Sequence, residues 1–186
     1  ALVLFFVIGC CGAVLLGRLS DIVDYLLYVD KKTGLPNREK LNIYIGEMAG
    51  KVLPEAFTCF TLSLDNLSEL TKRFGYTVGD GVLKDCAGLV QLMGDTEGMR
   101  GYNGVGRFVV FFEECSSKKA AAMIRILDNQ VEEYNSLNPE YPIRYTAAWA
   151  TTEETDTYEI RELLRLSQKK WKQMEKEKKD KTEEET

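Results

Sequence analysis

The chain has 186 residues, enough for one domain of ordinary size and a small additional segment. Its 24 basic and 29 acidic side chains give a net charge of −5, which argues against nucleic-acid binding through bulk phosphate neutralisation. Histidine is absent, which excludes histidine-based acid–base catalysis and histidine-ligated zinc, and the five cysteines form no CxxC pair, which indicates buried thiols.

The first 17 residues carry no charged side chain. This run is at the short limit for crossing a bilayer, which takes about 20 residues, so we predict the C-terminal part of a transmembrane helix over residues 1–17. A signal peptide and a buried helix of a soluble protein are the alternatives. The basic residues that follow favour a domain on the cytoplasmic side of the inner membrane; they are Arg18, Lys31, Lys32, Arg38 and Lys40.

Residues 18–29 continue the apolar pattern at helical spacing and predict a helical stalk. This stalk could pair with a second copy of the chain in a homodimer, or it could lie against its own domain. Gly34 and Pro36 then interrupt the helix and predict that a folded domain begins at residue 30.

The rest of the chain alternates helical and strand patterns up to a charged tail at residues 180–186. Helices are predicted over 37–49, 66–73, 78–93, 116–137 and 156–179. Strands are predicted over 56–64, 98–102, 107–113 and 142–151, with Asn103-Gly104 as the turn of a hairpin. This order predicts an α+β fold over residues 30–179, in which helices pack on one face of a sheet that contains antiparallel strands.

Four segments of this domain resemble motifs of the GGDEF family, whose active members are diguanylate cyclases. DKKTGLPNR at 30–38 is similar to the opening DxLTGLPNR turn and departs from it at Lys32. The others are LSLDNL at 62–67, FGYTVGD at 74–80 and GVGRF at 104–108, the last in the place of the GGDEF hairpin itself. The resemblance covers about residues 30–178 and implies a nucleotidyl-cyclase-like, ferredoxin-like palm domain, with a central, mostly antiparallel sheet flanked by helices and a membrane helix before it.

The resemblance also implies a chemistry in which two GTP molecules are joined into cyclic di-GMP by carboxylate-bound divalent metals. The two positions that supply carboxylates in the family are Ser63 and Gly106 in this sequence, and an acidic position beside the second is Arg107. Asp65 shares a strand face with Ser63, so it is a candidate metal ligand or, alternatively, the N-cap of the next helix. We therefore expect no catalytic residues and no metal or other cofactor, with Mg²⁺ and GTP required only if the domain is active.

Guanine recognition in the family uses an asparagine and an aspartate, which correspond here to Thr71 and Asp80. Asp80 could accept hydrogen bonds from guanine or could cap its own helix. A lysine of the family is Ser68 here, and the feedback motif RxxD falls on residues 95–98, where neither of its charged residues is kept.

Phosphate binding in the family uses two basic residues of the closing helix, of which one is Met174 here and the other is kept as Lys178. Arg107 and Lys178 could offer phosphates a positive charge in place of the metal, and Gly104 would leave room for close approach. Alternatively, Arg107 is an exposed strand residue that faces solvent.

These departures predict a catalytically degenerate, membrane-anchored signalling module that acts by dimerisation or by contact with a protein partner or ligand. One alternative is a receptor that binds a guanine nucleotide or cyclic di-GMP without turnover. Another is an active diguanylate cyclase that relies on Asp65, and a further one is a scaffold for a neighbouring catalytic domain.

Overall fold

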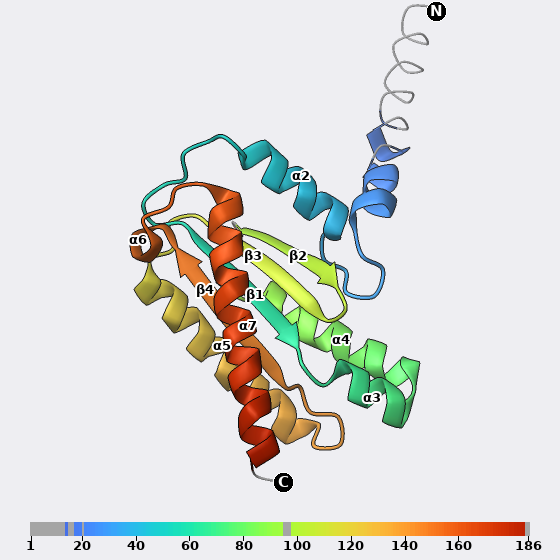
Figure 1. The fold of residues 1–186 in the computed structure, drawn as a ribbon. Coiled ribbons are helices and arrows are strands. Elements are labelled where there is room, and N and C mark those ends of the chain that lie inside the picture. Colours follow the sequence, from blue (N-terminus) through green and yellow to red (C-terminus); the bar gives the residue numbers. More distant parts are fainter. Residues whose placement is uncertain (1–13, 15–16, 20, 95–97, 185–186) are drawn as a thin grey trace, which may run out of the picture.

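The computed structural model describes residues 14, 17–19, 21–94 and 98–184. Its centre is a four-stranded antiparallel sheet in the order β2-β3-β1-β4 (Figure 1). The strands are β1 (Thr58–Leu64), β2 (Gly98–Gly104), β3 (Arg107–Phe112) and β4 (Tyr145–Thr151). The helices are α2 (Arg38–Met48), α3 (Leu67–Phe74), α4 (Tyr76–Gln91), α5 (Ser117–Leu137), α6 (Thr152–Thr155) and α7 (Ile160–Glu184).

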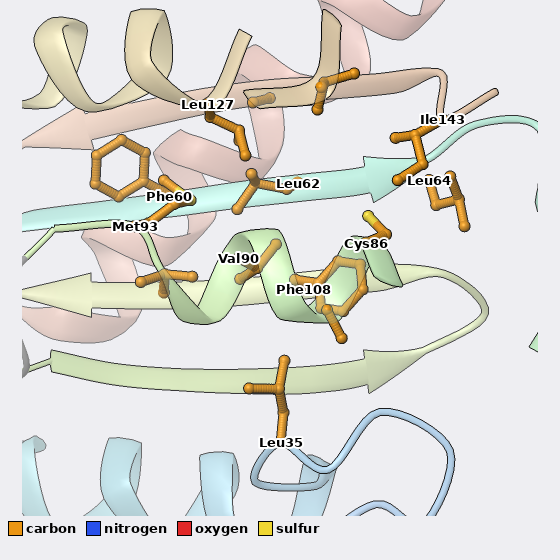
Figure 2. Close-up of a cluster of buried hydrophobic side chains, with 14 of the residues drawn as sticks. Leu35, Phe60, Leu62, Leu64, Cys86, Val90, Met93, Phe108, Leu127 and Ile143 are labelled. Atoms are coloured by element: carbon orange, nitrogen blue, oxygen red, sulfur yellow. The ribbon is translucent and has the colours of Figure 1, made fainter. Parts of the chain in front are cut away.

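Helices cover both faces of the sheet, so the prediction that they pack on one face is wrong. Alternation along β1 sends Phe60 and Leu62 into a core with α4 and α5, and Figure 2 shows Leu127 of α5 and Val90 of α4 beside them. Cys59 points the other way, into a smaller core with α2 and α7. All seven residues of β1 are buried, as expected for an apolar strand covered on both sides.

Two element boundaries differ from the prediction for local reasons. Strand β4 begins at Tyr145 instead of residue 142, since Pro142 has no N–H for a strand ladder and its carbonyl accepts a hydrogen bond from Asn66. Helix α7 continues to Glu184 into the predicted tail, with the pair Lys179–Glu175 at 2.9 Å supporting its last turns. The short helix α6 was not predicted.

The turn of the β2–β3 hairpin lies at Val105-Gly106, one turn later than the predicted Asn103-Gly104. Val105 and Gly106 both have positive φ, 52° and 70°, as the favoured two-residue hairpin turns require. This register buries Phe108 completely and places Arg107 opposite Ser63 of β1. Burial of the strand's apolar face therefore outweighs the local turn preference of Asn103-Gly104.

The predicted membrane segment 1–17 lies outside the described residues, apart from Val14 and Gly17. Within the described residues, no helix combines the length and apolar character needed to cross a bilayer. Residues 17–19 and 21–28 are helical, as predicted for the stalk, and this helix extends away from the domain beyond α2 (Figure 1). Leu19, Ile22 and Leu26 are each more than half exposed, so the stalk's apolar side chains do not pack against the domain.

Candidate functional site

A cavity of about 590 Å³ opens where β1 ends, between α3, the β2–β3 hairpin and α7. Of the residues singled out from the sequence, it brings together Ser63, Asp65, Ser68, Thr71 and Arg107. Gly104, Asp80 and Lys178 do not line it. Lys178 instead borders a neighbouring cavity of about 660 Å³, to which Asp65 also contributes.

The inner end of the cavity is closed by a chain of hydrogen bonds that starts at Trp171 of α7. The indole Nε1 donates to Ser63 Oγ at 3.0 Å, and Ser63 Oγ donates to Asp65 Oδ1 at 2.5 Å. Thr146 Oγ1 of β4 donates to the second carboxylate oxygen, Asp65 Oδ2, at 2.6 Å. Both carboxylate oxygens of Asp65 therefore accept hydrogen bonds from the protein itself.

The structure corrects the N-cap interpretation of Asp65. The N-cap of α3 is Asn66, which makes no capping side-chain bond and instead accepts from the backbone N–H of Arg144 at 3.1 Å. Lys178 Nζ lies 3.7 Å from Asp65 Oδ2 and donates to the Tyr145 carbonyl at 2.7 Å. Lys178, a candidate phosphate ligand, thus ties the end of α7 to β4 and to Asp65.

Gly106 offers no ligand at the second carboxylate position of the family. Its N–H donates to the Tyr102 hydroxyl at 3.1 Å, and its carbonyl accepts from the Leu64 N–H at 2.8 Å. A Cβ built on Gly106 would lie 3.2 Å from the Leu64 carbonyl oxygen and 3.3 Å from a methyl carbon of Leu67. Any side chain here would have to tolerate both this crowding and a φ of 70°.

These residues do not fit the magnesium–triphosphate centre that the resemblance implies. Mg²⁺ requires hard oxygen ligands in a near-octahedral array, including one or two carboxylates. Ser63 and Gly106 supply no carboxylate, and Asp65 is occupied by Ser63 and Thr146. Across the part of the chain that the structure describes, no group of three or more acidic, cysteine or histidine side chains could hold a metal.

The base-reading positions are likewise used within the protein. Asp80 accepts a hydrogen bond from Lys32 Nζ at 2.8 Å, and this bond raises the pKa of Lys32. Asp80 does not cap α4, which begins four residues earlier after Gly75, so that interpretation is wrong. Thr71 donates to the carbonyl of Leu67 at 2.8 Å and packs so closely on α4 that a Cβ at Gly79 would lie 2.3 Å from its hydroxyl oxygen.

The rim of the cavity differs from its inner end in charge and exposure. Arg107 and Lys72 line it and are exposed, and neither has an ion-pair or side-chain hydrogen-bond partner among the described residues. Val105 and Tyr76, which are 83% and 77% exposed, complete the rim. Gly104 lies in the same hairpin with φ 84°, and a Cβ there would meet no atom within 4 Å.

The sequence analysis missed several partners that define the site. The departure of Lys32 from the family turn was a signal for its pairing with Asp80. Trp171, which stands where the family usually has a tyrosine, was a signal for the bond to Ser63. Thr146 and Lys72 gave no signal, because their roles depend on contacts between segments far apart in the chain.

Comparisons with known proteins agree on one type of domain. A family model described as "Diguanylate cyclase, GGDEF domain" matches residues 27–181. No curated protein shows significant sequence similarity to the chain.

Solved structures similar to this chain share its fold at low sequence identity. A diguanylate cyclase/phosphodiesterase from Caldicellulosiruptor saccharolyticus has a TM-score of 0.65 at 18% identity, covering 83% of this chain and 91% of that one. The coiled coil and GGDEF domain of DgcB from Caulobacter crescentus, in complex with c-di-GMP, has 0.64 at 14% identity, covering 84% and 86%. The GGDEF domain of FimX from Pseudomonas aeruginosa has 0.63 at 18% identity, covering 76% and 90%.

Proposed function

Because the chain belongs to the GGDEF domain family, we propose that it is a signalling domain with the fold of a diguanylate cyclase and without its catalysis. The observation that carries this proposal is the hydrogen-bond chain from Trp171 through Ser63 to Asp65, which fills the place of the metal centre. The domain acts through dimerisation or contact with a protein partner, and nucleic acid is not a partner.

The proposal follows from what the family's reaction requires. The attacking 3′-hydroxyl of GTP must lose its proton, and the charge on the phosphates must be neutralised; carboxylate-bound metals do both. Removing one group that stabilises the transition-state charge costs about 10²- to 10³-fold in rate. With Ser63 and Gly106 in place of both carboxylates, the expected rate is below detection.

Membrane anchoring and dimerisation belong to the same proposal. The uncharged residues 1–17 support an anchor in the inner membrane, with the domain on the cytoplasmic side. The exposed apolar side chains of the stalk support pairing with a second copy, because an isolated helix with such a face would leave it in water.

The test is to incubate the full chain, purified in detergent, with GTP and either Mg²⁺ or Mn²⁺, and to analyse the products by chromatography and mass spectrometry. The expected result is no cyclic di-GMP at high protein concentration. An Asp65→Asn variant serves as the matched control. Product made by the wild type and lost in this variant would reject the proposal and establish an active cyclase that relies on Asp65.

A second candidate is a receptor that binds a guanine nucleotide or cyclic di-GMP without turnover. The observation in its favour is that Arg107 and Lys72 stand at the rim without acidic partners in the described chain, so they can neutralise phosphates without a metal. Calorimetry with GTP, GDP and cyclic di-GMP in EDTA tests it. Binding weakened by Arg107→Glu supports this candidate, and the absence of heat with all three ligands rejects it.

A further inference from the structure

The solvent-facing side of α7 carries a row of basic residues that neither the core nor the cavity explains. At about 100° of rotation per residue, five basic positions lie within a sector of about 80°. All five are exposed; they are Arg161, Arg165, Lys169, Lys172 and Lys176. We call this row the α7 basic stripe. In Figure 1, α7 crosses the front of the sheet from the α6 end to the C-terminus.

The pattern of the α7 basic stripe is unfavourable for the helix itself. Its neighbouring members are three or four residues apart, where like charges repel and opposite charges would stabilise. Arg161 and Arg165 also lie near the N-terminal end of α7, where the helix dipole disfavours cations. A helix selected for stability alone would alternate the signs of these charges, in a chain that is acidic overall.

Most of the stripe is free to bind a partner. Arg165 pairs with Glu162, the residue three positions earlier in α7. Within the described part of the chain, the four other members have no salt bridge and no side-chain hydrogen bond. Lys172 also borders a small cavity together with Arg107, so the positive surface continues from α7 onto the β2–β3 hairpin.

Acidic residues on both sides make the stripe narrow. Glu162 and Asp180 follow it at the next angular position on one side, and Glu175 lies on the other side. A flat membrane of anionic lipids, or a duplex about as wide as the domain, would meet these carboxylates as well as the stripe. A single acidic helix can lie along the stripe without touching them. The length of the stripe, about 22 Å for 15 residues, corresponds to about four turns of such a helix.

We propose that the α7 basic stripe is the docking surface for an acidic helix of a partner protein, with glutamates or aspartates on one face at intervals of three and four residues. The inference names the kind of partner for the signalling role above and rests on that role only for its biological meaning. The physical argument, from charge and shape, is independent of whether the domain makes cyclic di-GMP.

The experiment uses the full chain in phosphatidylcholine nanodiscs and a fluorescent alanine-based helical peptide with four glutamates on one face. A second peptide has the same four glutamates distributed around the helix. Binding is measured by fluorescence polarisation at low and high salt. We expect the one-faced peptide to bind at least about tenfold more tightly than its isomer, and its affinity to fall as salt is raised.

Matched charge reversals locate the binding surface. The variant Lys169→Glu/Lys172→Glu/Lys176→Glu is expected to lose at least about tenfold in affinity for the one-faced peptide. The control Lys51→Glu/Lys84→Glu/Lys118→Glu makes the same change in net charge at exposed lysines elsewhere and is expected to lose less than about twofold.

Equal losses in the two variants, or equal affinity for the two peptides, would overturn the proposal. So would stripe-dependent flotation with vesicles containing 30% phosphatidylglycerol, or stripe-dependent binding of a 20-base-pair DNA duplex, if either exceeded the binding of the peptide. A negative peptide result in a chain that makes no cyclic di-GMP would reject the docking surface alone. Cyclic di-GMP synthesis would reject the proposed function alone.

Discussion

The inner end of the cavity and its rim differ in how their polar groups are used. At the inner end, Ser63 and Asp65 bond to one another and to Trp171 and Thr146, so their binding capacity is spent within the fold. At the rim, Arg107 is exposed with no acidic partner among the described residues. The comparison teaches that the former metal position has become part of the structure, whereas the rim remains available for contacts.

The largest expected effect comes from Trp171, which is 8% exposed and joins α7 to the inner end of the cavity. Trp171→Ala should lower the free energy of unfolding by about 3–5 kcal/mol, because packing is lost and Ser63 loses its donor. Urea titration followed by circular dichroism measures this. Trp171→Phe, which keeps most of the packing and removes the donor, should cost about 1 kcal/mol. A loss of less than about 1 kcal/mol in Trp171→Ala would show that the inner end is not structural.

Two buried thiols predict an alkaline loss of stability. Burial raises the pKa of Cys59 to about 12, and burial together with the charge of Asp65 raises the pKa of Cys86 to about 12, from 9.0 for a free thiol. Because the folded values lie above the unfolded one, this stability is full below about pH 9 and is lost as the pH rises toward 12. Between pH 9 and 10, the free energy of unfolding should fall by about 2 kcal/mol.

Urea titrations at pH 8, 9 and 10 test this dependence. Cys59→Ala is the matched control, and it should show about half of the wild-type decrease between pH 9 and 10. A free energy of unfolding that stays constant across this range would contradict the burial of both thiols.

The hairpin glycines allow strain and crowding to be separated. Gly104→Ala and Gly106→Ala both place a side chain at positive φ, 84° and 70°, which costs about 1–2 kcal/mol. Only Gly106→Ala also brings a Cβ to 3.2 Å from the Leu64 carbonyl, so its loss of stability should be the larger. Thermal unfolding of both variants measures the difference. Equal losses would mean that Gly106 has room for a side chain, which would weaken the contrast between inner end and rim.

The smallest effects are expected at the rim. Arg107→Glu and Lys72→Glu change exposed charges without a partner in the described chain, so each should alter the free energy of unfolding by less than about 0.5 kcal/mol. Chemical denaturation measures this change. A loss above about 1 kcal/mol would show that the rim is also part of the structure.

Much of the fold was predictable, because hydrophobic periodicity reports which faces are buried. The order of the main helices and strands, apart from α6, follows from such patterns. The turn of the hairpin was not, since Asn103-Gly104 carries the stronger local signal while burial of Phe108 sets the register. The cover on both faces of the sheet was signalled by the unbroken apolar run of β1, a signal that the one-face prediction overlooked.

The site was predictable only as a set of departures. The absence of carboxylates at Ser63 and Gly106 is visible in the sequence. The partners that replace a ligand are not visible there, because Thr146 and Trp171 approach Ser63 and Asp65 only through the pairing of β1 with β4 and the packing of α7. Likewise, the pair Lys32–Asp80 joins residues 48 positions apart.

The most direct test of the central claim is a titration of Mn²⁺ into the full chain, followed by the electron paramagnetic resonance signal of the free ion. The account predicts that the wild type and Asp65→Asn remove equally little Mn²⁺ from solution, both alone and beyond what GTP itself binds. Removal of one or two Mn²⁺ ions per chain by the wild type, abolished by Asp65→Asn, would contradict it.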